Sequence, residues 1–171
     1  CKSIKSLSLG SRHDFTIVVA DDGSPSKQQT HGIRLIRGEN KGVATNKNRL
    51  LHFLRDCDFI FMIEDDVKIK SLKFVDDFIE FVQSTGFQAL FYGPIVEWPL
   101  WRIVSRDGKN IHYTTNIKHE DKKFFTSGSF SAITKEALKI VGGSYNYFRN
   151  GGGGPDHMEW SYRLYQYGFT K

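Results

Sequence analysis

The chain has 171 residues, of which 39% are hydrophobic and 25% charged, and its formal net charge is +5. This length suits one domain that buries roughly two-thirds of the surface of its unfolded chain. The apolar content, with 14 Phe, argues against intrinsic disorder. The two cysteines, Cys1 and Cys57, are too few for a thiolate zinc site or a disulfide scaffold. Because no apolar run approaches the ~20 residues of a membrane span and the first residues show no signal-peptide pattern, we expect a soluble cytoplasmic protein.

The basic charge leaves three classes of partner open. A pI of about 9.2 permits nucleic acid, an anionic membrane surface or a small molecule that carries phosphate. The lysines are scattered, and neither of the two short runs is interleaved with aromatic residues that would stack on bases. These runs comprise Lys68, Lys70 and Lys73, and Lys118, Lys122 and Lys123. A solvated face accounts for such runs, so basicity alone selects no partner.

Short apolar runs alternate with segments of helical period along the chain. The pattern predicts strands at residues 15–20, 33–37, 59–63 and 89–92, and helices at 43–55, 73–85, 135–141 and 155–167. The side chains expected to face the core from the first two helices are Val43, Leu50, Leu51 and Leu54, and Phe74, Phe78, Phe81 and Val82. Residues near 107–108 have the pattern of strands and loops. Without repeats or a boundary, this order predicts a single α/β domain with a mostly parallel sheet flanked by helices.

Two acidic clusters follow predicted strands, which is where parallel α/β sheets bind their ligands. Asp21 and Asp22 follow the first strand, where Asp and Gly also suit an ordinary turn. Three carboxylates, at residues 64–66, follow the third strand and repel one another unless water, lysines or a cation screens them. Because Mg²⁺ and Mn²⁺ prefer oxygen ligands, this second cluster predicts a metal site, with a solvated acidic turn as the alternative.

Lys47 falls near the apolar stripe of the helix at 43–55, where a lysine is unexpected. One interpretation is a side chain that extends along the apolar face and keeps its ammonium in water. The other is an ammonium directed at a nucleotide pocket from the first turns of that helix. The spacing does not decide between the two.

A glycine-rich stretch precedes the last predicted helix. Gly151 to Gly154 are followed by Pro155, which suits a helix start, and Asp156 and Glu159 have the spacing of a capping box. A carboxylate behind a glycine-rich loop is equally well placed as a general base. Asp156, Trp160 and Arg163 share one helical face, whereas His157 points elsewhere and would reach a metal only if the helix began later.

Taken in order, these segments resemble the family 2 glycosyltransferases, which transfer sugars from nucleotide diphosphates and have the Rossmann-like GT-A fold. The matching stretches span nearly the whole chain: DFTIVVADDGS (14–24), ENKGVATNKNRLL (39–51), FIFMIEDDV (59–67), TSGSFSAITKEALKIVGG (126–143) and DHMEWSYRLYQYGF (156–169). Each stretch is weakly specific, and their common order makes the resemblance specific.

The resemblance implies roles for the acidic clusters and for Lys47. Asp22, together with Asp21, would contact the nucleotide base. Lys47 stands where the family often has an arginine near the nucleotide, and Asn48 follows it as in the family. Glu64, Asp65 and Asp66 stand at the position of the metal-binding DxD motif, although Ile63 replaces its first Asp in the DxDD form. The resemblance favours Asp66 as the metal ligand, with Asp65 as the alternative.

In the C-terminal motif, Asp156 aligns with the Glu of the family's ED pair and His157 with its Asp, which is often the base. We expect Asp156 to be the base, with His157 as the alternative. Glu159 and Arg163 fit the later positions of the motif and, with Trp160, are candidates for contacts to the donor or acceptor sugar. Trp98, Trp101 and Tyr113 offer further aromatic faces for sugar rings, with core packing favoured for at least two of them.

The implied activity is an inverting, Mn²⁺- or Mg²⁺-dependent transfer from a UDP-sugar to a glycan or other hydroxyl acceptor, as in polysaccharide biosynthesis. The family's first strand has no counterpart here, residues 1–9 resemble the helix after it, and the family continues beyond Phe169. We therefore expect a fragment truncated at both ends, whose missing segments provide any peripheral membrane association. Two alternatives remain: an inactive domain that binds nucleotide-sugar or glycan, and a basic α/β domain that binds nucleic acid, a partner we do not expect.

Overall fold

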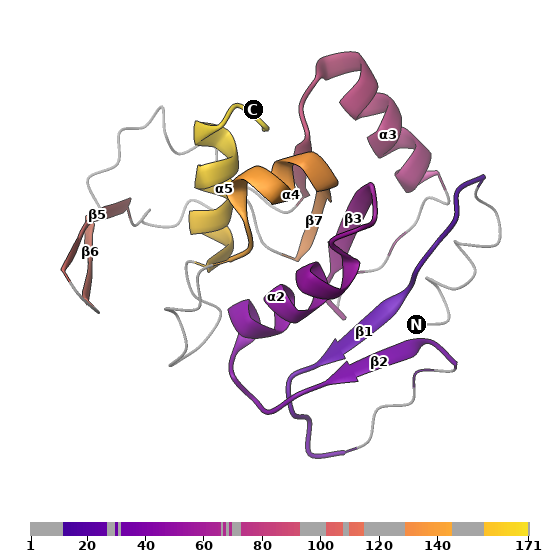
Figure 1. Ribbon diagram of the computed structural model, residues 1–171, viewed down its shortest axis with the longest axis horizontal. Coiled ribbons are helices and arrows are strands. Elements are labelled where there is room, and N and C mark those ends of the chain that lie inside the picture. Colours follow the sequence, from indigo (N-terminus) through magenta and orange to yellow (C-terminus); the bar gives the residue numbers. More distant parts are fainter. Residues whose placement is uncertain are drawn as a thin grey trace.

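Strands and helices alternate along the chain in the computed structural model (Figure 1). It describes residues 12–26, 30, 32–65, 67, 69, 73–92, 102–107, 110–114, 129–144 and 156–170. Several residues singled out from the sequence lie outside the described part: Cys1, Asp66, Trp98, Trp101, the glycine-rich stretch, and the side chains of Tyr113, Asp156 and His157. Among the described helices, none combines the length and the apolar character that crossing a bilayer requires.

The elements follow the predicted order closely. The strands are β1 (Val18–Asp21), β2 (Arg34–Arg37), β3 (Phe59–Ile63), β4 (Ala89–Tyr92), β5 (Arg102–Asp107), β6 (Asn110–Thr114) and β7 (Phe130–Thr134). The helices are α2 (Val43–Leu54), α3 (Phe74–Thr85), α4 (Lys135–Val141) and α5 (Asp156–Gln166). The prediction of a mixed α/β fold is confirmed, and β3 and β4 have the predicted bounds.

The strand pairing differs from the mostly parallel sheet that the sequence predicts. β1 and β2 are parallel, with Val18 opposite Arg34. The larger sheet has the order β3-β7-β4, and β7 is antiparallel to both neighbours. β5 and β6 form a separate antiparallel pair. The prediction is wrong for the larger sheet because β7, which had not been assigned as a strand, lies between two strands that run in the same direction as each other.

Helices cover both faces of the larger sheet because alternate side chains of β3 point to opposite sides. Ile60 and Met62 belong to the core cluster, which also takes residues from β4, β7, α2, α4 and α5. Phe61, on the other face, meets Phe74 and Phe78 of α3 edge to face, with ring centroids 5.3 Å away in each case. Both layers therefore fix the position of β3 (Figure 1), and with it that of Glu64 directly after the strand.

The buried faces of the helices agree only partly with the predicted stripes. In α2, Ala44 and Leu51 are buried, whereas Val43 is 45% exposed, which corrects its placement in the core. Residues 44 and 51 are seven apart and therefore lie on the same face of the helix. Val43 is one residue before Ala44, so its side chain is turned about 100° away from that face. In α3, Phe78 is buried as predicted, and Val75 is buried beside it.

Replacement of Leu164 by Ala tests the position of the core. Leu164 is 0% exposed, so we expect the substitution to lower the free energy of unfolding by about 2–5 kcal/mol. Ile140 on α4 is 50% exposed, and Ile140→Ala should change the free energy of unfolding by less than about 0.5 kcal/mol. Urea unfolding followed by circular dichroism measures both. Equal effects of the two substitutions would contradict this core.

Candidate functional site

Asp22, in the first acidic cluster, lies at the N-terminus of α2. Its Oδ2 accepts a hydrogen bond from Gly42 N at 2.8 Å, and its Oδ1 accepts from Lys41 N at 3.1 Å. Arg49, one and a half turns into the helix, reaches the same carboxylate with Nη1 3.2 Å from Oδ1. A carboxylate is favourable there because the first N–H groups of a helix have no partners within it and carry partial positive charge. Asp22 therefore joins the turn after β1 to the start of α2.

Asp21 is the buried member of the pair, with its side chain 2% exposed. Its Oδ1 accepts from Ser24 N at 2.9 Å, and its Oδ2 lies 3.4 Å from Arg37 Nε on the neighbouring strand. Hydrogen bonds from Ser24 lower the pKa of Asp21 below its usual value of 3.8. The bond from the Ser24 side chain has the larger effect, and the bond from its backbone the smaller. Burial acts in the opposite direction, and the guanidinium of Arg37 adds to the lowering. Asp21 is therefore held ionised.

Lys47 and Glu64 bring α2 to the second acidic cluster. Lys47 Nζ lies 3.2 Å from Glu64 Oε1, directly after β3. The lysine side chain is 12% exposed and the glutamate side chain 40% exposed, so the ammonium is enclosed while the carboxylate remains open to solvent. Lys47 thus does not extend along the helix into water, which was one of the two interpretations open from the sequence.

The same helix fixes the distance between the two clusters. Asn46 Nδ2 donates to the carbonyl of Ala20 at 3.2 Å, at the end of β1. Arg49 Nη2 donates to the carbonyl of Glu39 at 2.9 Å. Sequence reasoning missed Asn46 and Arg49, although the uninterrupted polar run from Thr45 to Arg49 inside a helix was the signal that could have revealed them. α2 therefore has one acidic cluster at its N-terminus and the other beside Lys47.

The carboxylates after β3 supply the donor atoms that a hard divalent ion prefers. Glu64 and Asp65 are both accessible, and Glu64 N is held by the carbonyl of Ser129 at 2.9 Å. Within the described ranges, no group of three His, Cys, Asp or Glu is arranged to hold a metal ion, and Asp66 lies outside those ranges. The two described carboxylates are too few to form a metal site by themselves, so an ion held there would need further oxygen ligands.

The side chains on α5 that were candidates for sugar contacts have partners inside the protein. Trp160 is 2% exposed, donates from Nε1 to the carbonyl of Gly142 at 2.8 Å, and meets Phe91 edge to face. Arg163 binds both carboxylate oxygens of Glu159, at 2.6 and 3.0 Å. The side chains of this ion pair are only 16% and 7% exposed. Packing accounts for all three residues, and their role toward a sugar stays a prediction.

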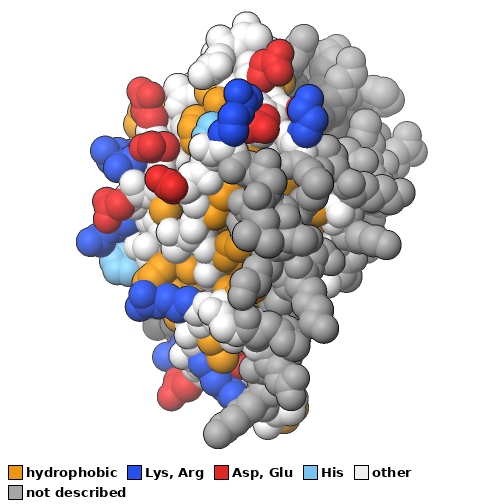
Figure 2. Space-filling model, turned by 90° about the vertical axis from the view of Figure 1, so that its right-hand side faces the viewer, with side chains coloured by type: hydrophobic (Ala, Val, Ile, Leu, Met, Phe, Trp, Pro, Cys, Tyr) orange, Lys and Arg blue, Asp and Glu red, His pale blue; other side chains and the backbone are white. Residues whose placement is uncertain are grey.

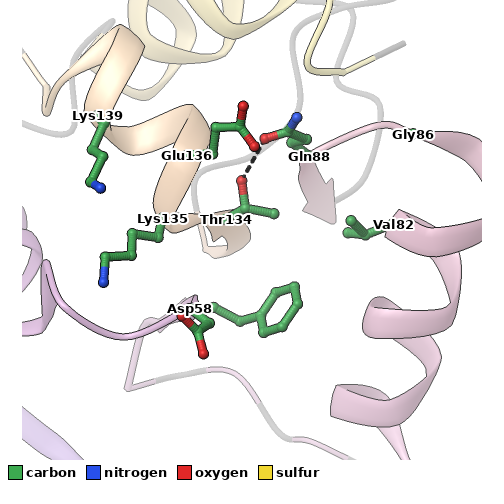
Figure 3. A pocket seen from close by; sticks show the side chains of 9 residues that line it. Asp58, Val82, Gly86, Gln88, Thr134, Lys135, Glu136 and Lys139 are labelled. Atoms are coloured by element: carbon green, nitrogen blue, oxygen red, sulfur yellow. Dashed lines mark hydrogen bonds between the residues drawn. The ribbon is translucent and has the colours of Figure 1, made fainter.

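A shallow hollow of about 580 Å³ lies at the opposite end of β3 from Glu64 (Figure 3). Its lining comprises Asp58, Phe59, Val82, Gly86, Gln88, Thr134, Lys135, Glu136 and Lys139. Thr134 donates to Gln88 Oε1 at 2.8 Å across it, and Lys135 Nζ donates to the carbonyl of Asp56 at 3.0 Å. The lining has two basic and two acidic side chains, so its formal charges cancel. The hollow shares no residue with the site predicted from the sequence.

Comparison of the chain with protein-family models, with curated proteins and with solved structures found no match.

The lowered pKa of Asp21 predicts a specific dependence of stability on pH. A carboxyl with a folded-state pKa below 3.8 stabilises the fold fully above pH 3.8, and this contribution is lost as the pH falls through the folded value. Between pH 5 and 2.5 the free energy of unfolding should therefore fall more steeply for the natural chain than for Asp21→Asn, measured by urea unfolding. Asp56, 87% exposed, provides Asp56→Asn as a control that should follow the natural chain. Parallel curves for Asp21→Asn and the natural chain would refute the assignment.

Arg163→Met tests whether the ion pair on α5 is structural. The substitution leaves Glu159 buried without its cation, so we expect a loss of about 3–5 kcal/mol in the free energy of unfolding. The double variant Arg163→Met, Glu159→Leu should recover part of that loss, because no uncompensated charge then remains. A residue that serves only a bound sugar would leave the unfolding curve within about 0.5 kcal/mol of the natural chain.

Proposed function

We propose that this chain is the catalytic domain of a metal-dependent, inverting glycosyltransferase that takes its sugar from a nucleotide diphosphate. The proposal includes the GT-A fold and family 2, which the sequence motifs favour. The expected donor is a UDP-sugar, and the acceptor is a hydroxyl of a glycan or of another molecule. We expect the reaction to take place in the cytoplasm.

The observation that supports the proposal is the position of α2 between the two acidic clusters. Asp22 binds the N-terminus of the helix, and Lys47 reaches Glu64 from its second turn. A nucleotide diphosphate needs hydrogen-bond acceptors for its base, a cation for its phosphates and oxygen ligands for the accompanying metal. In the proposed site Asp22 supplies the acceptor, because the neighbouring Asp21 side chain is only 2% exposed. Lys47 supplies the cation, and the carboxylates after β3 supply the oxygen ligands.

Each group has a defined task in the proposed reaction. Asp66, with Glu64 and Asp65, would hold the metal ion, which supplies Lewis-acid stabilisation of the charge on the leaving diphosphate. Lys47 would add a second positive charge at the phosphates. Asp156, or His157 as the alternative, would accept the proton of the acceptor hydroxyl as its oxygen attacks the anomeric carbon. The bond from that carbon to the diphosphate oxygen breaks in the same displacement, which inverts the configuration.

Around α2, the charges of the described residues give no support to the nucleic-acid alternative. On the face drawn in Figure 2, acidic side chains lie beside basic ones among the described residues. Arg37, Arg49 and Lys47 are each paired with a carboxylate. A groove that follows a phosphate backbone requires unbalanced positive charge. Such a groove is therefore not formed by these three basic residues.

Binding of nucleotide and metal to the whole chain tests the proposal. With UDP at about 100 times its Kd and Mn²⁺ present, the Tm should rise by roughly 5–10 °C, and neither ligand alone should give this rise. Asp66→Asn should lose the metal-dependent rise and the metal-dependent turnover, whereas Glu80→Gln, which removes an exposed acid on α3, should retain both. GDP and CDP, each with and without Mn²⁺, identify the base preference.

The alternatives predict other results from the same panel. A cooperative melt that no nucleotide shifts would exclude a nucleotide-sugar site. A Mn²⁺-dependent shift without sugar transfer to any acceptor would favour the inactive binding domain. Unchanged turnover in Asp66→Asn would remove that residue from the metal site.

A further inference from the structure

Among the described residues, the ion pair between Lys47 and Glu64 differs from that between Lys41 and Glu39 in how far its side chains are enclosed. Lys41 and Glu39 also lie 3.2 Å apart, but their side chains are 47% and 82% exposed. Those of Lys47 and Glu64 are 12% and 40% exposed. An exposed pair is screened by water and contributes little, whereas a partly enclosed ammonium interacts more strongly with a nearby charge. The electrostatic interaction with the carboxylate is therefore stronger for Lys47 than for Lys41.

The residues on either side of Lys47 fix the position of α2, whereas the lysine side chain itself is flexible. Its neighbours Asn46 and Asn48 anchor α2 to the carbonyls of Ala20 and Ser144, at 3.2 and 2.6 Å. The lysine side chain has a flexible four-carbon stem and a point-like charge, so its ammonium can change partner without moving the helix. Glu64 is the more exposed partner and lies at the end of β3, where a ligand can approach it.

We propose that Lys47 is a resident counter-ion of the donor site: it neutralises Glu64 while the site is empty and transfers to the diphosphate when the nucleotide binds. This inference rests on the proposed function and adds a mechanism of coupling to it. An ammonium beside Glu64 opposes a second cation there, because like charges within about 4–6 Å disfavour each other. A diphosphate that draws the ammonium away removes this opposition. Metal and nucleotide then strengthen each other's binding by the same factor.

Lys47→Met, with Lys41→Met as the matched control, tests the proposal through binding of Mn²⁺ alone and of Mn²⁺ with UDP. In the natural chain, saturating UDP should tighten Mn²⁺ binding about tenfold or more. In Lys47→Met, Mn²⁺ alone should bind about tenfold more tightly than to the natural chain, and UDP should then tighten Mn²⁺ binding by a smaller factor, because only direct ligation of the metal by phosphate remains. Lys41→Met should behave as the natural chain does. Calorimetry, or the electron paramagnetic resonance signal of free Mn²⁺, measures these affinities without any turnover.

Glu64→Gln provides the reciprocal measurement and does not depend on the folding of Lys47→Met. Removal of the Glu64 carboxylate takes away a negative charge that competes with phosphate for the ammonium, so UDP in the absence of metal should bind about tenfold more tightly than to the natural chain. Glu39→Gln, the equivalent change in the exposed pair, should leave UDP binding unchanged. Equal UDP affinity of Glu64→Gln and the natural chain would overturn the proposal.

The outcomes separate this inference from the function on which it rests. Unchanged Mn²⁺ affinity in a Lys47→Met variant that still binds UDP with Mn²⁺ would overturn the counter-ion role alone. Tighter Mn²⁺ binding by Lys47→Met, with no UDP binding by any variant, would overturn the proposed function and with it the transfer of Lys47 to a diphosphate. A smaller coupling in Lys47→Met, with full coupling in Lys41→Met, would support both.

Discussion

Helix α2 is the element on which the arrangement of the site depends. Four consecutive polar residues, Asn46 to Arg49, each contact a different segment: the end of β1, the residue after β3, the segment after α4, and the turn after β1. Because successive residues of a helix are about 100° apart, four of them surround its circumference. A short helix with so many polar side chains is not stable alone, so these tertiary contacts are what hold it in place.

A second set of hydrogen bonds joins α2 to the C-terminal helices α4 and α5. The carbonyls of residues 141–144, at the end of α4 and just beyond, all accept hydrogen bonds from side chains: two from Arg163, one from Trp160 and one from Asn48. The last carbonyls of a helix have no partners within it, and a cation near them is favourable. Gly143 has no room for a Cβ beside Asn48. The three helices therefore meet at one point of the backbone, directly before the segment that leads to α5.

Local pattern was sufficient to predict most of the elements and insufficient to predict how they pair. β3 and α4 have the bounds expected from the sequence because an apolar run and a helical period are properties of neighbouring residues. β7 was missed because Ser131 and Thr134 interrupt its apolar character, although both are buried. Its central position in the sheet depends on pairing with residues about 40 and 70 positions away, which neither propensity nor spacing specifies.

The candidate site shows the same division between local and distant information. The acidic turns and the unexpected Lys47 were recognisable from the sequence, whereas their partners Arg37 and Arg49 were not. Helical spacing correctly placed Trp160 and Arg163 on one side of α5, but the direction of that side was set by the end of α4. A residue's type predicts its chemistry, and only the packing of distant segments decides whether that chemistry faces a ligand or the protein.

Each described carboxylate that we place in the donor site, except the exposed Asp65, already has a basic partner: Asp21 with Arg37, Asp22 with Arg49 and Glu64 with Lys47. Enclosed ion pairs add little net stability, because the cost of removing two charges from water offsets their attraction. Stability alone therefore gives no reason for building this region from charges. Pairing does allow the fold to form without a ligand, since each of these three carboxylates has a basic partner. In the proposed site, binding is an exchange of partners in which phosphate replaces carboxylate at Lys47 and metal replaces lysine at Glu64. The total charge of the site is then nearly unchanged, and the two ligands are favoured together over either one alone.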